Sequence, residues 1–209
     1  MIRDVWRNKR WKKFPIHTKL VLGMTAALVL GGTFLFTLIE WNNPATMAAM
    51  PAGEKIMAGA FQSVTTRTAG FNSIDQNGLY GGSFLLTIIL MFIGAAPGST
   101  GGGIKVSRLL ILCKSARKEL QLYLHPNAVK KIKMDDKAIP HEVVRATNMF
   151  LFVYIMIFVI SLLIISLDNL DMVSNFTAIA ATLNNIGPGL GAVGPTGNLI
   201  RILIFPRLL

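Results

Sequence analysis

Charged residues and cysteine are both scarce in this 209-residue sequence. The single cysteine, Cys113, excludes an intrachain disulfide and leaves no second thiol for a metal site. Charged residues make up 15% of the chain, whereas a soluble globular domain usually contains about a quarter. The sequence has no nucleophile–base arrangement and no carboxylate pair, and its three histidines lack metal-ligand spacing. These absences predict a membrane protein that is not an enzyme and uses no cofactor.

Long uncharged stretches are what the sequence has instead. The runs 20–39 and 146–167 are long enough, at about 1.5 Å per helical residue, to cross a hydrocarbon core roughly 30 Å thick. The stretch 76–104 is also uncharged, but PGSTGGG interrupts it at 97–103. The stretch 172–200 contains the similar interruption NIGPG at 185–189. We expect two long outer helices, each followed by a broken return through the membrane.

The net charge of +11 comes from basic residues that alternate with the uncharged stretches along the chain. This pattern indicates membrane topology and not a nucleic-acid-binding face. Of the 21 Lys and Arg residues, 17 lie in the two segments 1–19 and 105–145. The positive-inside rule assigns both segments to the cytoplasm. The chain between them must then cross an even number of times, outward along 20–39 and back from about residue 79. The prediction is a multi-pass protein of the cell membrane, with a cytoplasmic N-terminus (1–19) and a basic cytoplasmic loop (114–142).

Each long helix is followed by a short one. A helix over 56–66 would be roughly 16 Å long, or half a bilayer, and leads into the extended segment 68–72. A second short helix is predicted over 172–183, where Asp171 offers N-cap chemistry, before the extended segment 185–189. The sequence therefore predicts an all-α membrane protein with two helix–half-helix pore loop–helix repeats (20–113 and 143–209), the second incomplete.

Such half-length helices have a physical use in a bilayer. Non-helical backbone is tolerated at membrane depth only where it lines a water-filled path or is buried in protein. The C-terminal end of a half helix carries a partial negative charge that favours a cation, and backbone carbonyls can replace the hydration shell of potassium. A lone glycine in TAGFN or NIGPG is more often a simple turn. Two such turns, each after a short helix, favour a cation path.

Three segments resemble the Trk/Ktr/HKT-type potassium uptake proteins. They are SVTTRTAGFN (63–72), FIGAAPGSTGGGIK (92–105) and TLNNIGPGLG (182–191), and HPNAV (125–129) resembles the Trk branch. The resemblance implies one polypeptide of four pore-loop repeats around a single pore, of which this sequence is similar to the third and fourth. By the same resemblance, potassium is bound by a selectivity filter formed by Thr68, Ala69 and Gly70 with Asn185, Ile186 and Gly187.

The resemblance also implies a gate. It interrupts the returning inner helix (80–113) below the filter and consists of Gly98, Ser99, Thr100, Gly101, Gly102, Gly103 and Lys105. A loop of four glycines with Ser and Thr cannot sustain a helix, because each Gly costs up to about 1 kcal/mol against Ala. A nucleotide-binding P-loop is excluded because Gly103 is followed by Ile104, so the G-x-x-x-x-G-K-[ST] spacing is not met.

Two basic residues near these segments each allow two interpretations. Lys105 either hydrogen-bonds loop carbonyls and holds the gate closed, or anchors the helix at the cytoplasmic surface. Arg67 either tunes the outer pore or forms a structural salt bridge, for which Glu54 and Asp75 are the candidate partners; the salt bridge is the interpretation we favour.

The sequence departs from the family pattern at its end. Only LIRILIFPRLL follows Asn198, which predicts an inner helix over 199–209 too short to span. We therefore expect that transport requires either the missing N-terminal repeats or a second copy of the chain. The alternative is a non-conducting remnant or interaction subunit. The resemblance further implies a cytosolic nucleotide-binding regulatory subunit as a partner, beside the lipid bilayer and potassium ions, and no nucleic acid.

Overall fold

The computed structural model of the protein describes residues 14–99, 101–125, 132–134, 137–168, 171–187 and 189–194. The predicted inner helix 199–209 and most of the predicted N-terminal segment 1–19 lie outside the described residues, as do Thr100 and Pro188. The described chain is mostly helical, which confirms the all-α part of the predicted fold class.

Two long helices, α2 (Ile16–Glu40) and α6 (His141–Ile165), are long and apolar enough to cross a membrane. Each begins directly after a proline, Pro15 or Pro140, whose fixed φ suits a helix start. In each, only 11% of the most apolar window is buried within the chain. Large side chains such as Phe34 and Leu163 are about two-thirds exposed, at 66% each. Exposed apolar surface of this extent on two long helices indicates that their side chains face lipid.

Two shorter helices follow the long ones. Helix α3 (Ala52–Thr68) begins after Pro51 and is longer than the predicted range 56–66. Helix α7 (Met172–Leu183) covers the residues of the predicted second short helix, and the Asp171 carboxylate accepts a hydrogen bond from the backbone N–H of Ser174 at 2.9 Å. Short 3-10 turns η2 (Gln76–Gly78), η3 (Ser166–Asp168) and η4 (Gly191–Val193) occur in the connections.

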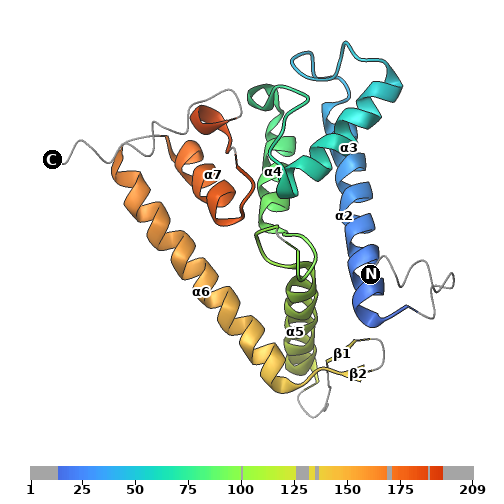
Figure 1. The fold of residues 1–209 in the computed structure, drawn as a ribbon, viewed down its shortest axis with the longest axis vertical. Helices are drawn as coiled ribbons and strands as arrows, with labels where there is room; N and C mark the ends of the chain where they lie inside the picture. Colours follow the sequence, from blue (N-terminus) through green and yellow to red (C-terminus); the bar gives the residue numbers. More distant parts are fainter. Residues whose placement is uncertain are drawn as a thin grey trace.

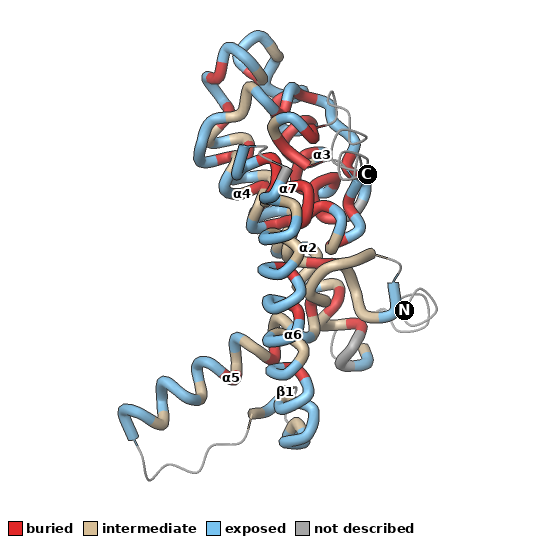
Figure 2. The backbone as a smooth tube through the Cα atoms, turned by 90° about the vertical axis from the view of Figure 1, so that its left-hand side faces the viewer, coloured by how far each residue is buried: buried red, intermediate tan, exposed pale blue. Residues whose placement is uncertain are grey.

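The return from the first short helix is a broken helix. Helix α4 (Gly81–Phe92) and helix α5 (Val106–Leu124) are separated by a loop (Figure 1), and Figure 2 shows α5 slanting away from the long axis of the molecule. Helix α5 continues past the predicted end at residue 113, because no Gly or Pro occurs between residue 104 and Pro126. A small antiparallel hairpin, β1 (Lys133–Met134) with β2 (Lys137–Ala138), lies within the predicted loop 114–142, which the sequence did not indicate.

Burial is concentrated at one end of the molecule. Figure 2 shows the buried residues gathered around α3, α4 and α7, whereas α5 and the far part of α6 are mostly exposed. On α3 the buried side chains are largely polar, among them Gln62, Ser63, Thr65 and Thr66 at 0–3% exposure. Polar groups buried between membrane helices are uncommon, and they indicate that this end of the fold serves more than packing.

A buried carboxylate holds the connection between α2 and α4. Glu40 is fully buried and accepts hydrogen bonds from Asn43 Nδ2 at 2.6 Å, from Thr46 Oγ1 at 2.6 Å and from the backbone N–H of Tyr80 at 2.9 Å. Asn43 Nδ2 also donates to the carbonyl of Gly78 at 2.7 Å. The end of the long helix, the loop after it and the start of the return helix are thereby tied together.

Candidate functional site

The first turn of interest follows α3, and we refer to residues 68–72 as the first elbow. The backbone N–H groups of Ala69 and Gly70 both donate to the carbonyl of Thr65, at 3.1 and 3.0 Å. Gly70 has φ +68°, the left-handed conformation that glycine adopts without a Cβ penalty. The Thr65 hydroxyl donates to the carbonyl of Phe71 at 2.6 Å, so the returning chain is fastened to the helix it has just left.

The second turn follows α7, and we refer to residues 184–189 as the second elbow. The N–H of Ile186 donates to the carbonyl of Ala181 at 2.9 Å, and Asn185 and Gly187 have φ of +53° and +114°. Further on, Thr177 Oγ1 accepts from the N–H of Leu190 at 3.0 Å. Both elbows are therefore reversals of the chain at the C-terminal end of a short helix, secured by a threonine hydroxyl of that helix.

The carbonyl groups of the two elbows are the feature that the sequence singled out. Within the described part of the chain, no hydrogen bond is donated to the carbonyl oxygens of Ala69, Gly70, Asn185, Ile186 or Gly187. Gly70 and Ile186 are buried, and most buried carbonyls in proteins have a partner, whereas Ala69, Asn185 and Gly187 are exposed. Two groups of unpartnered carbonyls, each at the partially negative end of a helix, form an environment suited to a cation.

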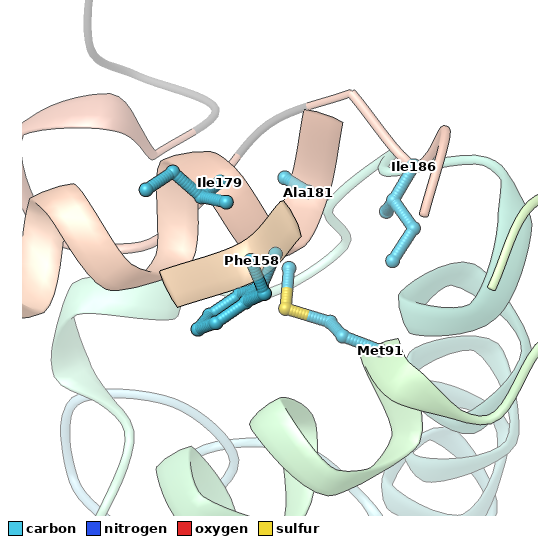
Figure 3. Close-up of a cluster of buried hydrophobic side chains, with 6 residues drawn as sticks. Met91, Phe158, Ile179, Ala181 and Ile186 are labelled. Atoms are coloured by element: carbon cyan, nitrogen blue, oxygen red, sulfur yellow. The ribbon is translucent and has the colours of Figure 1, made fainter. Parts of the chain in front are cut away.

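The side chain of Ile186 is used for packing and not for binding. It is 5% exposed and belongs to a buried cluster with Met91 of α4, Phe158 of α6, and Ile179 and Ala181 of α7. Figure 3 shows these side chains meeting between the three helices. The apolar side chain thus anchors the second elbow in the core, which leaves its main chain as the available polar surface.

The segment between α4 and α5, residues 93–105, is a closed loop, which we call the inserted loop. Its two ends are joined by backbone hydrogen bonds from Ile104 N to Phe92 O at 3.1 Å and from Gly94 N to Ile104 O at 3.0 Å. A further bond runs from Val106 N to Ala95 O at 3.4 Å. Because its two ends are joined by these hydrogen bonds, the loop is closed at its base, where α4 ends and α5 begins.

Lys105 is folded back onto the inserted loop. Its ammonium group donates to the carbonyl of Ser99 at 3.1 Å and also to the carbonyl of Gly101. Of the two interpretations of this residue, the geometry matches the one in which it hydrogen-bonds loop carbonyls. Gly98, Gly101, Gly102 and Gly103 all lie in the same loop.

Arg67 connects the first elbow to the inserted loop, and the predicted salt bridge is wrong. No ion pair joins Arg67 to Glu54 or Asp75, all three of which are described residues. Its guanidinium instead donates from Nε to the carbonyl of Ile93 at 3.4 Å and from Nη2 to that of Gly94 at 3.2 Å. Arg67 is 7% exposed, and these carbonyls replace the acid that a buried cation ordinarily needs.

Asn184 connects the second elbow to the same loop, and sequence reasoning missed its role. Its Nδ2 donates to the carbonyl of Ala180 at 2.7 Å, and its Oδ1 accepts from the Tyr154 hydroxyl of α6 at 2.7 Å. The backbone of Gly102 approaches so closely that a Cβ built there would lie 2.1 Å from the Asn184 carbonyl oxygen. The only signal in the sequence was a polar pair, Asn184–Asn185, at the end of an apolar helix.

The three predicted site segments are therefore neighbours in space. The inserted loop contacts the start of the first elbow through Arg67, and it contacts the second elbow through Asn184. Residues separated by more than a hundred positions in the sequence meet around one loop. In the described part of the chain, no group of three or more His, Cys, Asp or Glu side chains could hold a metal ion.

Comparison with known proteins identifies the family. The model of the family described as "TrkH: Cation transport protein" matches residues 10–207. The Trk system potassium uptake protein TrkH of Escherichia coli (strain K12) is 36% identical over 199 residues, which cover 92% of this chain and 37% of that protein. The Ktr system potassium uptake protein B of Vibrio alginolyticus is 47% identical over 115 residues, covering 53% of this chain and 25% of that protein.

A solved structure agrees with these sequence matches. The crystal structure of the potassium transporter TrkH from Vibrio parahaemolyticus superimposes with a TM-score of 0.75 at 32% identity, covering 83% of this chain and 37% of that one. The chain thus spans a little over a third of the length of these TrkH relatives. The resemblance inferred from the three glycine-containing segments is confirmed, and the chain belongs to the TrkH family of cation transport proteins.

Proposed function

We propose that this chain contributes two pore-loop repeats to a potassium uptake pathway. In this proposal Thr68, Ala69 and Gly70 of the first elbow, with Asn185, Ile186 and Gly187 of the second, supply carbonyl ligands to potassium. The observation that carries the proposal is the set of elbow carbonyls that accept no hydrogen bond in the described chain, at the ends of two short helices. The relatives named as potassium uptake proteins support the choice of ion.

The direction of transport follows from the membrane potential. With the basic segments 1–19 and 105–145 in the cytoplasm, the chain would be multi-pass with its N-terminus inside. A potential of 100 mV is worth about 2.3 kcal/mol per charge, nearly two decades of concentration, so potassium enters without ATP hydrolysis by this chain. A filter with one glycine per segment holds fewer ion-binding sites than a filter built from longer segments. We therefore expect it to discriminate only modestly against sodium.

The inserted loop is proposed as the gate of this pathway. It contacts Arg67, one residue before the first elbow, and Asn184 of the second elbow, and its sequence is rich in glycine. The two bonds of Lys105 to loop carbonyls favour one position of the loop, because hydrogen bonds with a charged donor are worth about 1.5–3 kcal/mol. Releasing them would shift the loop toward other positions. A cytosolic nucleotide-binding subunit acting on residues 114–142 is the proposed regulator.

The test is ion flux in two settings. The purified chain is reconstituted in liposomes and rubidium uptake is measured. The chain is also co-expressed with the remaining part of a TrkH relative in a host that lacks potassium uptake. Flux or growth rescue supports the proposal, and its absence in both settings favours the alternative of a non-conducting interaction subunit.

The filter and the gate are tested separately in whichever setting conducts. Gly70→Asp should lower the potassium/sodium permeability ratio, whereas Gly53→Asp, at an exposed position with open space around it, should not. An unchanged ratio in Gly70→Asp would remove the filter assignment. Lys105→Met should raise potassium flux, and a lower or equal flux would argue against the gate.

A further inference from the structure

A cleft lies between the middle of α5 (115–119), the β1–β2 hairpin and the start of α6. Its volume is about 590 Å³, and it is far from both elbows, at the opposite end of α6 in Figure 1. Charged and apolar side chains line it together, among them Lys118, Glu119, Ile139, His141, Val144 and Arg145. The proposed filter and gate use none of these residues, although most of them lie within the segment 114–142 on which the proposed regulator acts.

The charge of the cleft favours an anion. Lys118 and Arg145 carry two permanent positive charges against the single carboxylate of Glu119, and no ion pair or hydrogen bond within the described residues engages either cation. Arg108 of the same helix, by contrast, makes a cation–π contact, with its guanidinium 4.0 Å from the centre of the Phe150 ring.

The start of α6 adds to the positive electrostatic potential of the cleft. Its N-cap is Pro140, so no side chain caps the N–H groups of His141 and Glu142. The N–H of Val143 donates to the Pro140 carbonyl at 3.1 Å, and Glu142 adds one carboxylate to the first turn. His141, the first helical residue, lines the same cleft. The partially positive end of a 25-residue helix therefore adds to the two side-chain cations.

The surroundings place the cleft at a lipid surface. The uncharged run of α6 begins at Ala146, one residue after Arg145. On the neighbouring end of α5, Leu120, Tyr123 and Leu124 are 65, 86 and 76% exposed. Cations adjacent to exposed apolar side chains at the end of a membrane-spanning stretch lie where phosphate headgroups meet the hydrocarbon. Free phosphate would gain nothing from the apolar lining by Ile139 and Val144.

We propose that this cleft binds the headgroup of an anionic phospholipid, with Arg145 and Lys118 on its phosphodiester. Arg145 presents a planar fork of donors and Lys118 a point charge, a combination suited to phosphate oxygens. Basic pockets between membrane helices are known to hold anionic lipid headgroups. The site is independent of the proposed filter, so it is tested by lipid binding and not by flux.

The experiment measures lipid retention by the purified full chain. The chain in mild detergent is titrated with phosphatidylglycerol or with zwitterionic phosphatidylcholine, and bound lipid is counted by native mass spectrometry. Each cation near the surface is worth about fivefold in affinity, so Lys118→Gln with Arg145→Gln should weaken phosphatidylglycerol binding by roughly 25-fold. Arg117→Gln is the control for the loss of one positive charge, because this exposed residue of α5 does not line the cleft, and it matches each of the two single variants.

Each outcome decides the proposal. Preferential binding of phosphatidylglycerol that persists in Arg117→Gln, falls in the double variant and survives in Lys118→Arg with Arg145→Lys supports it. Equal phosphatidylglycerol binding by the double variant and the Arg117→Gln control overturns it. Inorganic phosphate at millimolar concentration should not compete, and competition below 1 mM (roughly the range of a free-phosphate site) would overturn the assignment to lipid. If the double variant loses its helical circular dichroism, the two single variants are used, with about fivefold expected for each.

Discussion

The closest approach between the inserted loop and the second elbow gives the sharpest prediction. Gly102→Ala adds one methyl group at a position where a Cβ would lie 2.1 Å from the carbonyl oxygen, 2.3 Å from the carbonyl carbon and 2.9 Å from the Cα of Asn184. Real Cβ atoms essentially never approach closer than 3.0 Å, so the two backbones must separate by about 1 Å. Neither side yields easily, because hydrogen bonds to Ala180 and Tyr154 hold Asn184.

The cost of this separation can be estimated. Overpacking in a well-packed region costs about 1–3 kcal/mol, and backbone on both sides puts this case at the upper end. For a chain of this size, 1 kcal/mol corresponds to about 2–4 °C in the unfolding midpoint. Gly102→Ala should therefore unfold about 6–12 °C below the parent protein, measured by thermal scanning in detergent.

The control is Gly81→Ala, at the first residue of α4. A Cβ there meets nothing within 4 Å, and alanine favours a helix over glycine, so the midpoint should stay or rise slightly. If Gly102→Ala unfolds at the same temperature as the parent and Gly81→Ala, the inserted loop does not lie against the second elbow, and this contact is refuted.

Three other substitutions probe the remaining contacts. Glu40→Gln weakens three hydrogen bonds to a buried carboxylate and should lower stability by about 1–3 kcal/mol; a midpoint within 1 °C (well under the 2–4 °C expected for about 1 kcal/mol) of the parent would contradict this. Arg67→Met removes both bonds to the inserted loop, and a cysteine placed at Ser99, with Cys113 replaced by serine, should then react several-fold faster with a thiol reagent; an unchanged rate would show that Arg67 does not restrain the loop. Hydrogen bonds from the side chain and backbone of Ser174 lower the pKa of Asp171 below its ordinary value. The ionised carboxylate of Asp171 therefore contributes fully to stability above the unfolded pKa of about 3.9, and this contribution is lost as the pH falls through the lower folded pKa. Asp171→Asn should reduce the loss of stability between roughly pH 4 and pH 2, and a parallel pH profile for the two proteins would argue against this cap.

The sequence by itself determined the helical elements and the family. Uncharged runs of about 20 residues have few alternatives to a membrane helix, since every backbone polar group must be satisfied within the bilayer. Prolines at 15, 51 and 140 explain where three helices begin, although the predicted ranges placed those starts a few residues late. The glycines in 68–72, 98–103 and 185–189 identified the elbows and the inserted loop, because positions that need positive φ or close approach are recognisable in a sequence.

Only the tertiary structure decided which groups hold these segments together. Arg67 has acidic residues within reach along the sequence, yet it bonds the carbonyls of Ile93 and Gly94, which α4 brings beside it. Asn184 joins the second elbow to α6 and to the inserted loop, because it accepts a hydrogen bond from Tyr154 and lies against the backbone of Gly102. Local patterns specify elements because they depend on neighbours in the chain. The partners of a buried polar group depend on helix packing, which sequence periodicity does not encode.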